Sequence, residues 1–260
     1  MQNHLFYQKI KKNISARKNY ICLGLDPDLN KLPVKYPQNI QGLTDFLINA
    51  IEDTKDLVIC YKPNISFFEA LGIDGLKLLE KICQIIPDNV PIILDAKRGD
   101  IGNTSKCQAK YIFDYFKADA ITLHPYMGLD SLSPFFEYQD KFCFVLALTS
   151  NPGAGDFEKQ TLANNKPLYS LVVERCAVWH QQYQNIGLVV GGTQKELGEL
   201  RNINSDLLFL IPGVGAQGGD YQNSVNLGKN KDDLAIVNIS RGILYSDLGF
   251  RKAFESFLAN

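Results

Sequence analysis

The segment "VPIILDAKRGD", residues 90–100, joins an apolar run directly to a cluster of charges. A short run of this kind is typical of a β-strand that is buried on both faces. Because side chains alternate along a strand, Asp95 and Lys97 are expected on the same face as Ile93, beyond the buried part of the strand. Asp100 is expected in the turn that follows. The segment therefore predicts a buried strand that delivers charged side chains to an open end.

Similar apolar runs recur along the chain, and helix-like amphipathic stretches separate them. The runs lie at residues 20–26, 57–64, 90–97, 120–125, 142–150, 186–193, 207–215 and 234–242. The helix-like stretches include residues 42–55, 65–86, 104–116, 166–183 and 193–202. Eight strands alternating with helices in 260 residues predict an α/β fold, a (β/α)8 TIM barrel that forms a single domain over residues 1–260. A doubly wound open sheet is the alternative, but the first run ends in "GLDPD" without a G-x-G-x-x-G turn.

The N-terminus and the composition restrict the cellular location and the classes of partner that the sequence predicts. Leu5, Phe6, Ile10 and Ile14 have helical spacing, which predicts an extra N-terminal helix rather than a signal peptide. No apolar run reaches the roughly 18 residues that a membrane span needs, and a net charge of -1 gives no basic excess for nucleic acid. The six cysteines are widely spread without a C-x-x-C pair, which predicts free thiols and a reducing, cytoplasmic location. His4 and His180 lie in helix-like stretches and are predicted to be surface residues.

Polar residues gather at the C-terminal ends of the predicted strands. They are Asp26, Lys62, Asp95, Lys97, His124, Thr149, Ser150, Thr193, Ser240 and Arg241. In a barrel these ends surround one mouth, which is where barrel enzymes carry their chemistry. A single polar residue there could be a helix cap, but agreement from one run to the next along the chain favours a functional site.

Lys97 lies between two carboxylates, Asp95 and Asp100, and negative neighbours favour its protonated form. A protonated lysine suits proton donation, whereas Schiff-base chemistry needs a neutral amine. An ion pair that ties a loop to a strand would explain the same spacing, because structural ion pairs also perturb pKa values. Lys62 could pair with Asp26 across the mouth in the same way.

The last two strands predict a phosphate site. The glycine-rich segment "IPGVGAQGG" (211–219) follows the seventh strand, and "NISRG" (238–242) follows the eighth, with Arg241 at the start of a predicted helix. The loops after these two strands commonly bind phosphate in barrels, and arginine adds bidentate contacts.

A signature of the form D-x-K-x-x-D-I-x-x-T runs through Asp95, Lys97, Asp100, Ile101 and Thr104. "GLDPD", "YKPN", "TSNPG", "IPGVGAQGGD" and "NISRG" appear around it in the order that the same family has. With these segments the sequence resembles the orotidine 5′-phosphate decarboxylase family, and "LHPYMGLDSLSPF" and "TSNPGAGDFE" look like its longer bacterial subgroup.

The resemblance implies a homodimer with shared active sites that converts orotidine 5′-monophosphate to UMP and CO2 without a metal or an organic cofactor. It implies that Lys97 protonates C6 and that Asp95 lies against the departing carboxylate and holds the lysine. Asp100 and Thr104 would reach the ribose of the partner subunit's substrate. The other implied substrate contacts are Asp26 and Lys62 to ribose hydroxyls, Ile101 within the signature, Ser150 to the pyrimidine edge, Gln217 to base and phosphate, and Arg241 to the phosphate.

Two other functions compete with this interpretation. A metal-dependent sugar-phosphate decarboxylase or synthase of the same superfamily would need an acidic ligand near the second strand, where this chain has Lys62 in "CYKPN". A non-catalytic nucleotide-binding barrel would not need a lysine held between carboxylates. Residues 214–234, which are glycine-rich and polar, are the predicted lid over the site.

Overall fold

Eight strands form one sheet in which all seven hydrogen-bonded pairs are parallel, in the order β2-β1-β8-β7-β6-β5-β4-β3. The structure is a computed structural model that describes residues 4–191, 194–213 and 220–259. The strands are β1 (Ile21–Leu25), β2 (Cys60–Pro63), β3 (Ile93–Arg98), β4 (Ala120–Leu123), β5 (Phe142–Leu148), β6 (Ile186–Val190), β7 (Phe209–Ile211) and β8 (Ile236–Ile239). Seven of them lie inside the runs expected from the sequence, and β3 extends one residue beyond its run, to Arg98.

The two edge strands of this sheet, β2 and β3, meet and close it. Parallel bridges join Tyr61 to Ile92 and Asn64 to Asp95, and the Tyr61 amide donates to the Pro91 carbonyl at 3.0 Å. Closure removes both sheet edges and makes a barrel. The predicted (β/α)8 barrel is therefore confirmed, and the open-sheet alternative is wrong.

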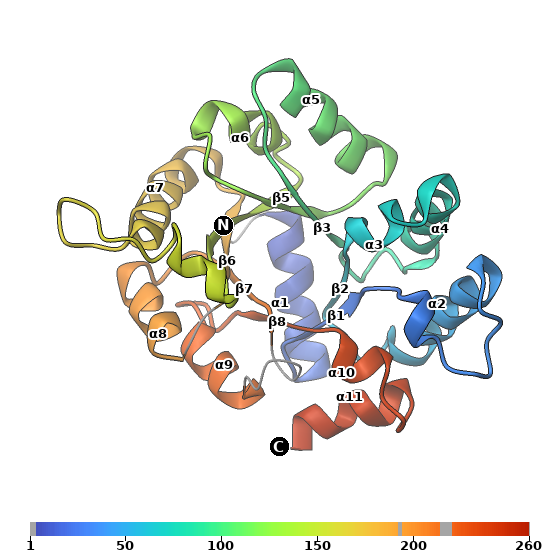
Figure 1. Ribbon diagram of the computed structural model, residues 1–260. Coiled ribbons are helices and arrows are strands. Elements are labelled where there is room, and N and C mark those ends of the chain that lie inside the picture. The colour runs from blue at the N-terminus through green and yellow to red at the C-terminus, as the bar shows by residue number, and fades with distance from the viewer. Residues whose placement is uncertain (1–3, 192–193, 214–219, 260) are drawn as a thin grey trace.

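Helices surround the barrel, as Figure 1 shows in a view along its axis. They are α2 (Ile40–Thr54), α3 (Ile65–Glu69), α4 (Gly72–Ile85), α5 (Asn103–Lys110), α6 (Leu129–Phe136), α7 (Leu168–Tyr183), α8 (Gln194–Ile203), α9 (Tyr221–Gly228), α10 (Arg241–Leu244) and α11 (Phe250–Ala259). Short 3-10 turns cover Leu29–Lys31 and Pro152–Gly155, and a π-helical turn, Tyr111–Tyr115, follows α5. Outward-facing strand residues pack against these helices in the larger of the two apolar cores.

The extra N-terminal helix, α1 (Leu5–Arg17), packs on the inner core instead of the outer ring. Its Phe6, Tyr7 and Ile10 share this core with inward-facing strand residues such as Phe142 and Leu210, and Phe6 stacks on Phe142. In Figure 1 the helix lies across the middle of the ring of strands. The helix is confirmed, although Leu5 from the expected apolar face is 52% exposed. α1 thus covers the end of the barrel at which the strands begin and leaves the other end for chemistry.

Three local features differ from the sequence expectations. The stretch 65–86 is two helices, because Gly72, the first residue of α4, adopts a left-handed φ of +67°. His180 is buried, and its Nδ1 accepts a hydrogen bond from the Ile186 amide at 3.2 Å. Its prediction as a surface residue is therefore wrong. Part of the predicted lid is the regular helix α9, whereas residues 214–219 lie outside the described residues.

All six cysteines are free thiols, and Cys22, Cys60 and Cys143 are buried in strands as expected. None of the helices in the described ranges is long and apolar enough to cross a membrane.

Candidate active site at the C-terminal mouth of the barrel

Asp95 is the centre of a charged cluster in which three strands meet. Its Oδ1 accepts hydrogen bonds from Lys97 Nζ at 2.6 Å and from Thr122 Oγ1 at 2.8 Å. Its Oδ2 accepts from Lys62 Nζ at 2.7 Å. Lys62 comes from β2 and Thr122 from β4, the two neighbours of β3 in the closed barrel. The partner of Lys62 in this cluster is thus Asp95 and not Asp26, because closure of the barrel brings β2 beside β3.

The charges of this cluster stabilise one another. Burial would raise the pKa of Asp95, but the ammonium groups of Lys62 and Lys97 hold it well below its usual range. Burial likewise opposes the charge on Lys62, but the carboxylates of Asp95 and Asp26 outweigh it and raise the pKa of Lys62. Asp95 is therefore an anion and Lys62 a cation at neutral pH.

The two lysines differ in how open they are. The Lys62 side chain is only 5% exposed, whereas the Lys97 side chain is 49% exposed. Lys97 is thus the more accessible of the two lysines, and Lys62 lies deeper, beside the carboxylate of Asp95.

The backbone at the end of β3 is shaped to hold Lys97 in place. Lys97 has a left-handed φ of 45°, which is uncommon for a residue with a side chain and costs on the order of 1–3 kcal/mol. The Ala96 and Lys97 amides both donate to Thr122 Oγ1 at 3.1 Å. The pairing between β3 and β4 shifts register between Leu94 and Arg98, which marks a bulge at this point. The Thr122 hydroxyl therefore fixes both the strained backbone and the carboxylate that faces Lys97.

The first strand adds a second carboxylate to the mouth. Asp26 follows β1, and its buried Oδ1 has no hydrogen-bond partner among the described residues. On the β8 side of the mouth, Asn238 Oδ1 and Ser240 Oγ are also buried without a described partner. The mouth thus contains oxygen atoms that the described parts of the chain do not satisfy.

The rest of the signature lies on the rim, away from this cluster. Asp100 Oδ1 accepts a hydrogen bond from the Ile101 amide at 2.7 Å, and no hydrogen bond joins Asp100 to Lys97 or Lys62 in the described structure. Ile101 is 66% exposed, and Thr104 is exposed in the first turn of α5. One chain therefore exposes Ile101 and Thr104, while Asp100 is half-buried in the turn before them.

The fifth strand ends in two hydroxyl residues with different surroundings. The Thr149 hydroxyl and amide both donate to the carboxylate of Glu158, at 2.7–3.0 Å. Ser150, the next residue, is exposed. Glu158 thus accepts hydrogen bonds from both the amide and the hydroxyl of Thr149, and Ser150 is the more exposed of the two residues.

Arg241 begins the short helix α10 directly after β8, as the sequence predicted, and it is exposed. Gln217 and Thr193, which the sequence also placed at the mouth, lie outside the described residues. In the described parts of the chain, no three His, Cys, Asp or Glu side chains are grouped so that they could hold a metal ion.

Sequence reasoning missed Thr122 and Asn238 as members of the site. Each lies inside an apolar run, "AITLHP" or "LAIVNISRG". The signal that could have found them is alternation: Thr122 is two residues after Ala120, and Asn238 is two after Ile236, and both of these residues face the inner core.

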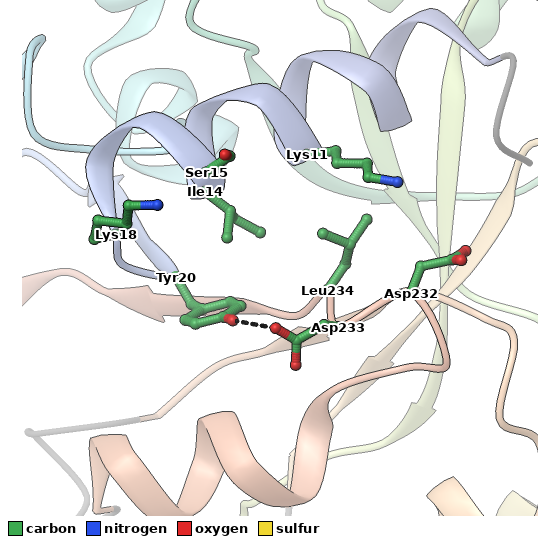
Figure 2. Close-up of a pocket in the computed structure, with 8 residues that line it drawn as sticks. All are labelled: Lys11, Ile14, Ser15, Lys18, Tyr20, Asp232, Asp233 and Leu234. Atoms are coloured by element: carbon green, nitrogen blue, oxygen red, sulfur yellow. Dashed lines mark hydrogen bonds between the residues drawn. The ribbon is translucent and has the colours of Figure 1, made fainter.

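A second pocket, of about 380 Å³, lies at the opposite end of the barrel. Figure 2 shows it between α1 and the loop before β8, lined by Lys11, Ile14, Ser15, Lys18, Tyr20, Asp232, Asp233 and Leu234. Its acidic groups already have partners, since Tyr20 donates to Asp233 and Tyr7 donates to Asp232. The mouth, with its open lysine and with buried oxygens that lack a partner among the described residues, is the stronger candidate for chemistry.

The fold and this mouth together define a class: an α/β barrel that presents a carboxylate-bound lysine at the C-terminal ends of its strands. Residues 19–256 match the family described as "Orotidine 5'-phosphate decarboxylase / HUMPS family". The chain belongs to this family.

Curated relatives and solved structures agree with this assignment. The chain is 46% identical over 249 residues to a protein of Dehalococcoides mccartyi named orotidine 5'-phosphate decarboxylase, covering 94% of this chain and 90% of that protein. It is 42% identical over 261 residues to the protein of the same name from Herpetosiphon aurantiacus, covering 98% and 97%. The crystal structure of a putative orotidine-monophosphate-decarboxylase from Toxoplasma gondii superposes with a TM-score of 0.92 at 35% identity, covering 97% of this chain and 93% of that one.

Proposed function

We propose that this protein is a carboxy-lyase that converts orotidine 5′-monophosphate to UMP and CO2, a step of pyrimidine biosynthesis. The observation that carries the proposal is the hydrogen-bonded set Lys62–Asp95–Lys97 in a chain of this family, with Lys97 alone open to the mouth. The names of the curated relatives support the same reaction.

Lys97 is the proposed proton donor. When the bond between C6 and the carboxylate breaks, CO2 leaves and the electron pair stays on C6, where the ring delocalises it poorly. A fixed ammonium beside C6 stabilises this charge and then transfers a proton from Nζ to C6. Lys97 regains its proton from solvent in a later step. Asp95 holds the ammonium in position and lies against the departing carboxylate.

The remaining roles follow the family motifs. Asp26 and Lys62 hold ribose hydroxyls, and Ser150 contacts the pyrimidine edge; the engagement of Thr149 by Glu158 supports Ser150 for this role. Arg241 binds the phosphate, together with Gln217. The energy of phosphate binding helps to align the reacting end, as remote substrate groups do in many enzymes.

We also propose a homodimer in which Asp100, Ile101 and Thr104 of one subunit complete the site of the other. The exposure of Ile101 and Thr104 supports this, as does the lack of a hydrogen bond from Asp100 to the charged cluster of its own chain in the described structure. Exposed apolar side chains on the next loop, Tyr126 at 83% and Met127 at 38%, add surface that a partner subunit could cover. The six free thiols support a reducing location, which we propose is the cytoplasm.

The test is the loss of orotidine 5′-monophosphate absorbance on addition of purified protein with a chelator present. We expect turnover that survives chelation, because the proposed chemistry uses Lys97 and no metal. Activity that vanishes with chelator and returns with magnesium would favour the metal-dependent sugar-phosphate alternative. UMP binding without any turnover would favour the non-catalytic barrel.

Lys97→Ala should fold but lose turnover, because it removes the proton donor from a half-exposed position. Lys9→Ala is the matched control, since Lys9 also pairs with a carboxylate, Asp119 at 2.9 Å, but lies on α1 at the closed end. A Lys97→Ala protein with nearly normal kcat would contradict the proton-donor role.

A further inference from the structure

The Tyr245 hydroxyl holds the loop that follows β1 at two points. It accepts a hydrogen bond from the Asp28 amide at 2.8 Å and donates one to the Asp26 carbonyl at 3.1 Å. Only Pro27, which has no amide hydrogen, separates these two residues. Both distances are normal for hydrogen bonds, and together the bonds fix the peptide groups on either side of Pro27. Tyr245 therefore restrains the backbone at Asp26, the carboxylate residue that β1 brings to the mouth.

Tyr245 reaches this loop from a distant part of the sequence. It follows α10 directly, and its amide donates to the Arg241 carbonyl at 3.1 Å. Its ring stacks on Phe46 of α2, with the ring centroids 5.4 Å apart and the planes at 17°. Burial raises the pKa of Tyr245 to about 12, so the hydroxyl keeps its proton at neutral pH and can donate it in a hydrogen bond. Packing of the ring thus places the hydroxyl at a defined point between α10 and β1.

The loop held by Tyr245 borders open space. A pocket of about 520 Å³ lies beside it, lined by loop residues 27–30 and by residues of α3 and of the turn after it. The carboxylate of Asp28 accepts a hydrogen bond from the Asn30 amide and pairs with Lys31, so these contacts stay within the loop. Without the Tyr245 hydroxyl, the backbone at Asp26 has room to shift.

The position of Asp26 affects the charged cluster. Gly24 pairs in register with Lys62 on β2, and Asp26, two residues further on, continues the same face. The carboxylate of Asp26 is one of the charges that raise the pKa of Lys62. Lys62 in turn donates to Asp95 at 2.7 Å, and Asp95 accepts from Lys97 at 2.6 Å. A displaced Asp26 would therefore disturb a series of charges that ends at the proposed proton donor.

We infer that Tyr245 is a positioning residue for the proposed reaction, whose hydroxyl holds Asp26 in place beside Lys62. The inference rests on the proposed function, in which Asp26 and Lys62 hold the ribose hydroxyls, and it adds a residue that lies outside the sequence motifs. Tyr245 also joins the loop of Asp26 to the helix that begins with Arg241, the proposed phosphate ligand. The residues for ribose and for phosphate thus belong to one connected unit.

Tyr245→Phe tests the inference, because it removes the hydroxyl and keeps the ring on Phe46. Wild type, Tyr245→Phe, Asp26→Ala and the double variant are compared in kcat/KM for orotidine 5′-monophosphate and in affinity for UMP, measured by calorimetry. Urea unfolding reports the stability of each protein. Tyr36→Phe is the matched control, since Tyr36 also packs on Phe46, at 5.4 Å, and its hydroxyl accepts a hydrogen bond from Asn49 of α2.

Tyr245→Phe should lower both kcat/KM and the affinity for UMP by about 5- to 30-fold, because Asp26 loses its fixed position. In the Asp26→Ala protein, the same change should alter both values by less than about twofold, since it acts through a group that is already absent. Tyr36→Phe should lower only the stability. Unchanged values in Tyr245→Phe, or equal losses with and without the Asp26 carboxylate, would overturn the inference and leave Tyr245 a structural role.

Failure of the proposed function gives a different result. A wild-type protein that binds UMP but does not turn over orotidine 5′-monophosphate would refute the proposed reaction, and the UMP affinities of the same four proteins would then decide the role of Tyr245. An active wild type with an equally active Tyr245→Phe variant would overturn the inference alone. A wild type that neither binds UMP nor turns over the substrate would overturn both.

Discussion

Replacing Thr122 with valine tests how the barrel holds its reactive lysine. Thr122 is 2% exposed, and valine has nearly the same shape, so the substitution removes the hydroxyl without opening a cavity. The hydroxyl donates to Asp95 Oδ1 at 2.8 Å and accepts from the Ala96 and Lys97 amides at 3.1 Å. Thr122→Val therefore leaves two amide donors unpaired and takes one donor from a buried carboxylate.

The magnitude follows from these three bonds. An unpaired buried donor costs about 1–3 kcal/mol, and the Lys97 amide is only partly buried, so its share is smaller. We expect the free energy of unfolding to fall by about 2–4 kcal/mol. The amide bond also holds Lys97 at its left-handed φ of 45°. Releasing it should displace the ammonium and lower kcat by about 10- to 100-fold.

Urea unfolding and the absorbance assay measure the two effects. Thr122→Ser is the control, because it keeps the hydroxyl and loses only a methyl group, at a cost of about 1 kcal/mol. If Thr122→Val matched Thr122→Ser in both unfolding free energy and kcat, the hydroxyl would not support Lys97, and the reasoning would be refuted.

Three further predictions concern the phosphate, the partner subunit and acid stability. Arg241→Ala should lower kcat/KM for orotidine 5′-monophosphate by a factor that corresponds to on the order of 2–5 kcal/mol of lost transition-state stabilisation, and should barely change kcat/KM for orotidine. Equal losses on both substrates would mean that Arg241 is structural. Lys97→Ala and Asp100→Ala should each be inactive, but refolding the two proteins together should restore about a quarter of wild-type activity. Half of the dimers are then mixed, and each mixed dimer has one intact site of two. An inactive mixture, with mixed dimers confirmed by mass, would exclude the shared site. Burial lowers the pKa of His180 from 6.5 to about 4, so the neutral ring contributes stability above pH 6.5 that is lost as the pH falls toward 4. Relative to His180→Gln, wild type should lose about 2–3 kcal/mol of unfolding free energy across this window, and parallel pH curves would contradict the assignment.

The barrel itself could be predicted from the sequence, because its signals are local. Apolar runs such as 90–97 and 142–150 are long enough for a strand and lack the polar alternation of a half-exposed one. Asp95 and Lys97 share a face because side chains alternate along a strand, and the polar residues at the strand ends identify the mouth. The N-terminal helix followed from spacing, although which of its residues are buried depended on the core that it meets, as exposed Leu5 shows.

The partners within the site could not be predicted in this way, because they depend on contacts between distant segments. Lys62 lies 33 residues before Asp95, and the two meet only because β2 and β3 close the barrel. Thr122 became part of the site because the bulge in β3 turns two amides toward it.

The amino-acid sequence by itself therefore determined the strands, the order of the elements and the placement of Asp95 and Lys97 at a strand end, since each of these depends on neighbours along the chain. Only the tertiary structure decided which charges pair, which lysine is open, that His180 is buried, and which oxygens on β8 lack a described partner. The physical reason is that burial and pairing depend on distances across the closed barrel, which the spacing of residues along the chain does not encode.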